Sequence, residues 1–227
     1  MSELKLLLDQ SYPLLREFRD LCPGTFKHSI EVSLLVESVS SVLKLDIDFM
    51  KVCAVYHDIG KMTNPKFFSE NQKDEDLHND LDPWISYNII TRHVSDSVNI
   101  LINDKHFPRE IIETISQHHG TSLVKYFFNK AKNGNIDLNE HEFRYKCYKP
   151  KTIESGLLMI CDQIEVASSV KENYNTEVLV EDIVGYLLND GQLDDVVMRL
   201  GDLKLIKQTL IEELESRKNR RVDHDKE

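Results

Sequence analysis

The chain has 227 residues, of which 41% are hydrophobic and 30% are charged, a composition typical of a folded domain rather than a disordered chain. The formal net charge of -11 disfavours binding to a nucleic-acid polymer, because such binding needs clustered Lys and Arg. The apolar runs are too short to span a membrane, and the N-terminus lacks the basic start and apolar core of a signal peptide. We therefore expect a soluble cytoplasmic protein with no membrane partner.

This length predicts one compact domain over 1–217, followed by a charged, frayed tail over 218–227. The four cysteines show no paired spacing, so we interpret them as reduced thiols. No motif indicates the oligomeric state.

Helical spacing of apolar residues predicts three helices at the start of the chain, over 3–20, 25–43 and 47–59. Thr25 is the expected N-cap of the second helix, and Gly60 is expected to end the third.

The polar segment 63–80 is long for a loop, and we expect it to be a lid or a partly disordered stretch. Asp82 and Pro83 then form a typical helix start, and Ser122 is the expected cap of a later helix. Further helices are predicted over 83–103, 108–119, 122–132, 151–170, 177–189 and 202–216. Because no segment shows a sustained strand pattern, the predicted fold class is all-α, a single compact multi-helix domain.

Seven ionisable side chains stand out on these otherwise apolar helices: His28, His57, Asp58, His93, His118, His119 and Asp162. A single core histidine is most often a structural residue with satisfied hydrogen bonds. Five histidines and two aspartates on five helices are harder to explain that way, because burying several ionisable groups together is costly without compensation. A pair of metal ions would compensate them directly.

Imidazole and carboxylate ligands without a thiolate favour Fe, Mn, Zn or Ni. Asp58 has two oxygens and can bridge two ions. Two ions about 3.5–4 Å apart would place a hydroxide in line with a phosphorus atom. The expected reaction is therefore hydrolysis of a phosphoester or phosphoanhydride.

The order His28, His57-Asp58, Asp162 resembles the HD superfamily of metal-dependent phosphohydrolases. Six longer strings, spread over residues 20 to 215, resemble the HD domain of the seven-transmembrane-receptor type cyclic di-AMP phosphodiesterases. These strings are PGTFKHS (23–29), YHDIGK (56–61), FFSENQ (67–72), QHHGTSLV (117–124), KPKTIES (149–155) and DGQLDD (190–195).

The resemblance implies an HD-domain fold and a dinuclear site, with iron or manganese expected and zinc, nickel or cobalt also compatible. It implies hydrolysis of cyclic di-AMP to linear pApA by attack of a metal-bridging hydroxide. The implied ligands are His28, His57, Asp58 and Asp162 for one ion, and Asp58, His93, His118 and His119 for the other. Catalytic roles fall to His57, Asp58 and Lys61. The Lys61 ammonium is suited to pairing with a non-bridging phosphate oxygen. The structural alternative is an exposed lysine at a helix end, where its charge interacts favourably with the helix dipole.

Two departures from the family pattern limit what can be carried over. The residues 145–148 replace a proline- and glycine-rich turn. The family's transmembrane helices and extracellular sensor are absent from this sequence, so we expect a soluble stand-alone domain and do not carry over the family's mode of regulation. The glycine-tyrosine-proline string of the related cyclic di-GMP enzymes is also missing, which disfavours that alternative.

The residues predicted to bind the substrate are Lys61, Asn71, Thr121, Lys125, Arg144 and Lys149. Gln72 is a further candidate, and Tyr145 and Tyr148 are candidates for stacking on adenine. Candidates for orienting the ligating imidazoles are Asp96, Gln163 and Glu165. For each of these the structural or solvated alternative stays open. The remaining histidines, predicted to be solvated, are His78, His106, His141 and His224.

Two other functions stay open. An HD phosphohydrolase could act on a different cyclic dinucleotide, on linear pApA or on a nucleoside phosphate. A nucleotide sensor without turnover is the other hypothesis, which the complete ligand set disfavours.

Overall fold

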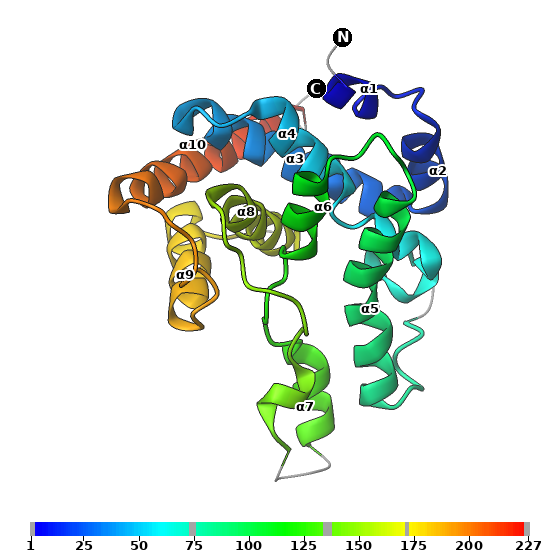
Figure 1. The fold of residues 1–227 in the computed structure, drawn as a ribbon. Helices are drawn as coiled ribbons and strands as arrows, with labels where there is room; N and C mark the ends of the chain where they lie inside the picture. The colour runs from blue at the N-terminus through cyan, green and yellow to red at the C-terminus, as the bar shows by residue number, and fades with distance from the viewer. Residues whose placement is uncertain (1–2, 73–75, 134–137, 171–172, 225–227) are drawn as a thin grey trace.

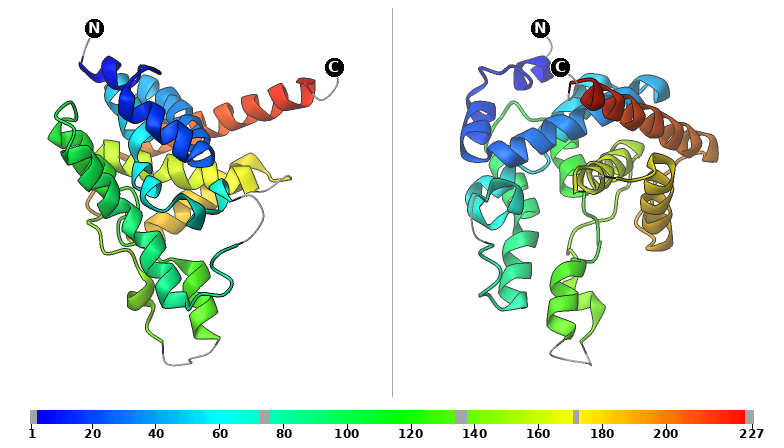
Figure 2. Two further views of the ribbon diagram at one scale, coloured as in Figure 1. Left: turned by 90° about the vertical axis from the view of Figure 1, so that its right-hand side faces the viewer. Right: turned by 180° about the vertical axis from the view of Figure 1, so that it is seen from behind.

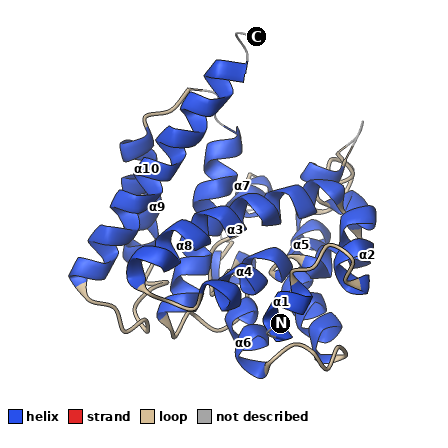
Figure 3. Ribbon diagram, turned by 90° about the horizontal axis from the view of Figure 1, so that it is seen from above, coloured by secondary structure: helices blue, strands red, loops and turns tan. Residues whose placement is uncertain are grey.

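The structure, a computed structural model, describes residues 3–72, 76–133, 138–170 and 173–224. These residues form helices and connecting segments without a strand, and their one β-type pairing is an isolated bridge between Leu123 and Arg144. Figure 3 shows the described chain as helix and loop throughout. The predicted all-α fold class is confirmed.

The main hydrophobic core lies around one long helix, α3 (Pro23–Leu43), in the upper part of Figure 1. Helix α3 packs against α4 (Ile47–Tyr56), α8 (Ile153–Val170) and α10 (Leu200–His224). Two shorter helices also contribute to this core, α6 (Arg109–Ser116) and α9 (Thr176–Asn189). The helices that carry the predicted ligands are thus anchored by their apolar faces.

A second, aromatic core lies below the first, where α5 (Pro83–Ile102) packs against α7 (Lys125–Lys132). Figures 1 and 2 show these two helices extending away from the main helical body. The buried side chains of this aromatic core are Tyr87, Phe127, Phe128 and Phe143.

The helix predicted over 3–20 is two helices, α1 (Glu3–Leu7) and α2 (Pro13–Leu21). Pro13 occupies the first turn of α2, where its missing N–H costs nothing, rather than a helix interior. The turn between the helices is fixed by Asp9 Oδ1, which accepts a hydrogen bond of 2.8 Å from Ser11 N.

Thr25 is not an N-cap, contrary to prediction, because α3 begins at Pro23. The first amides of α3 are satisfied from another part of the chain. Asn71 Oδ1 accepts hydrogen bonds from Gly24 N at 3.0 Å and from Thr25 N at 3.1 Å. A cap supplied by a residue this distant leaves no local signal in the sequence.

Helix α4 ends at Tyr56, and the chain continues through His57 and Asp58 into a 3-10 helix, η1 (Ile59–Thr63). Gly60 lies inside η1 and does not end the helix as predicted. A Cβ atom at Gly60 would lie only 2.0 Å from His93 O. Glycine is therefore required because η1 approaches the backbone of α5 closely.

The segment expected to be a lid or partly disordered is ordered over residues 63–72. It forms two 3-10 helices, η2 (Pro65–Phe67) and η3 (Ser69–Asn71), and Phe68 between them is buried. Residues 73–75 of this segment lie outside the described residues.

The helices predicted after residue 82 are present, but several of them begin or end at other residues than predicted. Asp82 caps α5 as predicted, accepting a hydrogen bond from Trp84 N at 2.8 Å. Helix α6 ends at Ser116, so His118 and His119 lie in the turn that follows it. Ser122 caps no helix, since α7 begins later, and α10 extends beyond residue 216 to His224.

Candidate metal centre

The seven predicted side chains converge on one buried cluster, which we call the imidazole cluster: His28, His57, Asp58, His93, His118, His119 and Asp162. They come from α3, the end of α4, α5, the turn after α6, and α8. Because these segments are packed around the main core, the ligand atoms are held in place by helices rather than by free loops.

Asp58 lies at the centre of the cluster, and its two oxygens face different imidazoles. Oδ1 lies 3.2 Å from His93 Nε2 and 3.7 Å from His118 Nε2. Oδ2 lies 3.2 Å from His57 Nε2 and 3.9 Å from His28 Nε2. One carboxylate therefore separates two potential cation sites.

Two groups of potential ligand atoms result, each with its atoms within 4.8 Å of one another. The groups are Asp58 with His93, His118 and His119, and Asp58 with His28 and His57. Asp162 reaches both, since Oδ1 lies 3.1 Å from His28 Nε2 and Oδ2 lies 3.8 Å from His119 Nδ1.

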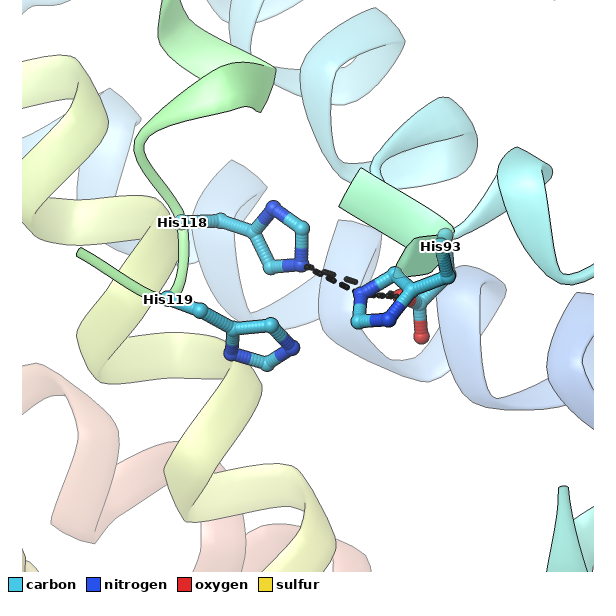
Figure 4. A group of neighbouring side chains, drawn as sticks. His93, His118 and His119 are labelled. Atoms are coloured by element: carbon cyan, nitrogen blue, oxygen red, sulfur yellow. Dashed lines mark hydrogen bonds and ion pairs between the residues drawn. The ribbon is translucent and has the colours of Figure 1, made fainter. Parts of the chain in front are cut away.

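The backbone fixes which nitrogen of three imidazoles faces the cluster. Nδ1 of His57, His93 and His118 donates to the carbonyl oxygen three residues earlier, at 2.8, 2.6 and 2.6 Å. When these imidazoles are neutral, their Nε2 atoms carry lone pairs directed into the cluster. Figure 4 shows His118 and His93 directed toward each other, and their Nε2 atoms lie 3.3 Å apart.

The cluster is incomplete without a further group. His57 Nε2 and Asp58 Oδ1 are buried and have no hydrogen-bond partner. Two acceptor nitrogens 3.3 Å apart, next to an unsatisfied carboxylate oxygen, repel one another unless a cation lies between them. The residues present therefore fit divalent metal ions, which accept imidazole and carboxylate ligands.

The two groups of potential ligands also differ in the charge of their imidazoles. Burial lowers the pKa of His118 and holds the pKa of His119 well below its usual value. Both imidazoles are therefore neutral, the form in which a ring nitrogen can bind a metal ion. Burial also lowers the pKa of His57, but Asp58 and Asp162 outweigh it and raise the pKa to about 10. Without a cation the carboxylates thus retain a proton on His57, which a bound metal would displace.

Lys61, predicted to be catalytic, lies at the edge of the cluster. Its Nζ atom lies 2.7 Å from Asp58 Oδ2 and 2.8 Å from Glu70 Oε1, and 5.0 Å from the centre of the Phe68 ring. Burial lowers the pKa of Lys61, but Asp58 and Glu70 reverse that effect and leave the net shift upward. Lys61 is therefore a fixed positive charge.

A cavity of about 720 Å³ opens onto the cluster. Glu70 lines it together with six of the predicted residues: His28, Asp58, Lys61, His119, Asp162 and Glu165. This cavity connects the candidate metal ligands to solvent.

Most of the other predicted substrate contacts lie elsewhere. Thr121, Arg144 and Lys149 line a second cavity, of about 570 Å³. Asn71 is engaged in capping α3, and Lys125 is exposed at the start of α7. Their role in substrate binding stays a prediction that these positions do not favour.

Arg144 is bound by acceptors of the chain itself. It donates to both oxygens of Asp190, at 2.7 and 2.9 Å, to Thr121 O at 2.9 Å, and to Glu140. Gln192, which sequence reasoning missed, is fully buried and donates to Asp190 Oδ2 at 2.8 Å. We call these five residues the Arg144 cluster.

Of the residues predicted to orient the imidazoles, one contacts a ligating histidine and another does not. Glu165 contacts His28 Nδ1, as expected of a supporting carboxylate. Asp96 instead accepts from Arg92 of its own helix, at 3.3 Å. Gln163 stays a prediction. Tyr145 is buried with its ring centre 4.4 Å from that of His119, whereas Tyr148 is exposed.

Of the histidines predicted to be solvated, one was predicted wrongly. His78 is buried, and its Nε2 lies 2.8 Å from Phe67 O, which holds the end of η2. His106 is half-buried beside Asp104, and His141 is exposed. The side chain of His224 lies outside the described residues.

Residues 25–167 match the HD domain family. The chain belongs to this family. Its sequence is 36% identical over 230 residues to the cyclic-di-AMP phosphodiesterase PgpH of Bacillus subtilis, a match that covers 99% of this chain and 32% of that protein. The PgpH of Listeria monocytogenes is 34% identical over 227 residues, which cover 98% of this chain and 32% of the relative. The chain thus spans about a third of the length of these curated relatives.

The fold of this HD domain is also that of solved structures. The crystal structure of the L. monocytogenes phosphodiesterase PgpH HD domain superimposes with a TM-score of 0.85 and 33% identity, covering 91% of this chain and 99% of that chain. The same domain in complex with cyclic-di-AMP matches with a TM-score of 0.85 and 35% identity, covering 90% and 96%. Among the described residues, no helix combines the length and apolar content needed to cross a membrane.

Proposed function

We propose that this HD domain is a metal-dependent phosphodiesterase that hydrolyses cyclic di-AMP to linear pApA. The observation that carries the proposal is the position of Asp58, whose two oxygens face two separate groups of imidazoles. The substrate is supported by the relatives, which are named cyclic-di-AMP phosphodiesterases, and by the solved HD domain in complex with cyclic-di-AMP.

The site would hold two divalent ions, with iron or manganese favoured by its ligand types. His28, His57, Asp58 and Asp162 would hold one ion, and Asp58, His93, His118 and His119 the other. When bound, two such ions activate water as a nucleophile and neutralise charge on the phosphate.

The residues of the chain itself have distinct tasks in this reaction. The backbone carbonyls that bind Nδ1 of His57, His93 and His118 keep the ligating nitrogens pointed into the site. Lys61 extends a fixed ammonium into the cavity, where it can pair with a non-bridging phosphate oxygen as charge develops.

The cavity supports a small-molecule substrate, and the cysteines support a reducing cellular compartment. A volume of about 720 Å³ falls within the range of pockets that enclose small ligands. Cys22, Cys53, Cys147 and Cys161 are free thiols, as expected in the reducing cytoplasm, where we place the reaction.

The test is a nucleotide panel assayed on protein of known metal content. Protein loaded with Mn²⁺ is given cyclic di-AMP, cyclic di-GMP, linear pApA and a nucleoside monophosphate, and products are separated by chromatography. We expect cyclic di-AMP to be turned over fastest and pApA to accumulate. His57→Ala should abolish turnover, whereas His141→Ala, which removes an exposed imidazole, should not change it.

Each alternative gives a different result. Faster turnover of another nucleotide would make the chain a different phosphohydrolase. Tight binding of cyclic di-AMP without product would make it a sensor.

A further inference from the structure

Glu70 is the one acidic residue of the FFSENQ string. It lies in η3 and lines the same cavity as Asp58 and Lys61. Its Oε1 atom accepts hydrogen bonds from Lys61 Nζ and from Thr25 Oγ1, both at 2.8 Å. Glu70 thus connects Lys61 to the first turn of α3.

The position of Glu70 is fixed by tight packing. Asn71, the next residue, caps α3, and its Nδ2 donates to Thr25 Oγ1 at 2.7 Å. A Cβ atom at Gly24 would lie 1.8 Å from Glu70 O, so only glycine permits this close approach. The carboxylate of Glu70 is therefore held at a set distance from the cluster.

Lys61 forms ion pairs with two carboxylates, and only one of them, Asp58, is a candidate metal ligand. It contacts Asp58 through Oδ2, which is the oxygen that faces His57 and His28. A cation held by those imidazoles would also engage this oxygen, and it would then repel the ammonium beside it. Among the residues that the structure describes, Glu70 is the other carboxylate paired with Lys61.

We propose that Glu70 is a positioning residue for Lys61. It retains the ammonium in the cavity when Asp58 Oδ2 is engaged by a cation, so that Lys61 neither competes with the cation nor leaves the place where a phosphate binds. The catalytic part of this inference depends on the proposed function, whereas the part that concerns metal binding does not.

The chain offers a matched control pair on the packed helices α3 and α4. Glu37 of α3 accepts from Lys51 of α4 at 2.7 Å, a lysine–glutamate pair of similar length that lines neither cavity described above. Glu37→Gln removes the same charge as Glu70→Gln without touching Lys61.

The first experiment titrates Mn²⁺ alone into metal-free protein by calorimetry. In Glu70→Gln, Asp58 is the one carboxylate partner that Lys61 retains among the described residues. We therefore expect Mn²⁺ affinity to fall about fivefold, the scale of one partly exposed ion pair. Adding Lys61→Met should restore it, because the competing ammonium is gone. Glu37→Gln should bind Mn²⁺ as the wild type does.

The double variant separates positioning from a structural role. If Glu70 merely held η3 in place or ligated a metal itself, Glu70→Gln would weaken Mn²⁺ binding as much in the Lys61→Met background as in the wild type. That result, or an unchanged affinity in Glu70→Gln, would overturn the proposal. Circular dichroism of each variant reports whether the fold is retained.

The second experiment measures turnover of cyclic di-AMP at saturating Mn²⁺. We expect kcat of Glu70→Gln to fall to nearly that of Lys61→Met, and the double variant to be no slower than Lys61→Met. Equal kcat for Glu70→Gln and wild type would contradict the catalytic part. If the wild type binds Mn²⁺ but does not hydrolyse cyclic di-AMP, the proposed function fails while the Mn²⁺ titrations still decide the role of Glu70.

Discussion

The imidazole cluster and the Arg144 cluster both contain ionisable groups, but only in the Arg144 cluster are those groups satisfied by partners within the chain. In the first, His57 Nε2 and Asp58 Oδ1 are buried without a hydrogen-bond partner. In the second, the guanidinium of Arg144 donates to Asp190, Thr121 and Glu140. An unsatisfied buried group costs free energy, so the first cluster needs a ligand and the second stabilises the fold by itself.

The two clusters are neighbours, joined through the chain at Arg144 and Tyr145. Tyr145 packs against His119, while Arg144 and Gln192 hold the Thr121 turn that follows His119. The Arg144 cluster therefore supports the turn that presents two of the candidate ligands. This difference can be tested, since variants in the two clusters should affect different properties.

The largest expected effect comes from Asp58→Ala. Because both groups of imidazoles share this carboxylate, we expect Mn²⁺ binding to be lost and turnover of cyclic di-AMP to fall by more than about 10³-fold. Metal content by elemental analysis and a steady-state assay measure both. Full metal occupancy in Asp58→Ala would show that the two groups do not share a bridging ligand.

Metal removal should lower stability in a way that depends on the imidazole cluster. With Mn²⁺ at about 100 times its dissociation constant, we expect the free energy of unfolding to rise by about 2.7 kcal/mol over that of the chelator-treated protein. Urea unfolding with and without Mn²⁺ measures the gain. Asp58→Ala should show no gain, whereas Arg144→Met should show the full gain.

Arg144→Met should reduce stability without removing the metal. It leaves the Asp190 carboxylate with Gln192 as its hydrogen-bond donor and deprives Thr121 O of its partner. Because the pair is largely buried, we expect a loss of about 2 kcal/mol, between the values for exposed and fully buried pairs. A fall in Mn²⁺ stoichiometry instead would show that metal binding by His118 and His119 depends on the support that Arg144 gives to the Thr121 turn.

The smallest effect is the pH dependence of that loss. The hydrogen bond from Arg144 lowers the pKa of the Asp190 carboxyl below its ordinary value. A lowered folded-state pKa contributes stability above the unfolded-state pKa, and the contribution is lost as the pH falls through the folded-state value. The stability difference between wild type and Arg144→Met should therefore be constant above about pH 5 and shrink below about pH 4. A difference that grows toward low pH would contradict this assignment.

Local patterns in the sequence predicted most of the fold. The helical period of apolar residues gave the helices from α3 to α9 within a few residues, and Asp82 with Pro83 marked the start of α5. The errors arose where the deciding contact is distant. Asn71, not Thr25, caps α3. His78 belongs to the segment that was expected to be a lid or partly disordered, yet it is buried against Phe127 of α7.

The residue types of the candidate site were also predictable, since five histidines and two aspartates on apolar helices are unusual. Their classification into ligands, supports and substrate contacts was less so. Arg144 resembled a phosphate-binding residue until Asp190, 46 positions away, proved to hold its guanidinium. Glu70 stood within a recognised string, but only its distance to Lys61 gives it a role.

The sequence by itself determined the helical class, the family and the side chains available for chemistry, because periodicity and motifs are local properties of the chain. The tertiary structure decided which oxygen of Asp58 faces which imidazoles, which charges are already paired, and which are left for a ligand. Those facts depend on contacts between residues tens of positions apart, and such contacts exist only once the helices have packed.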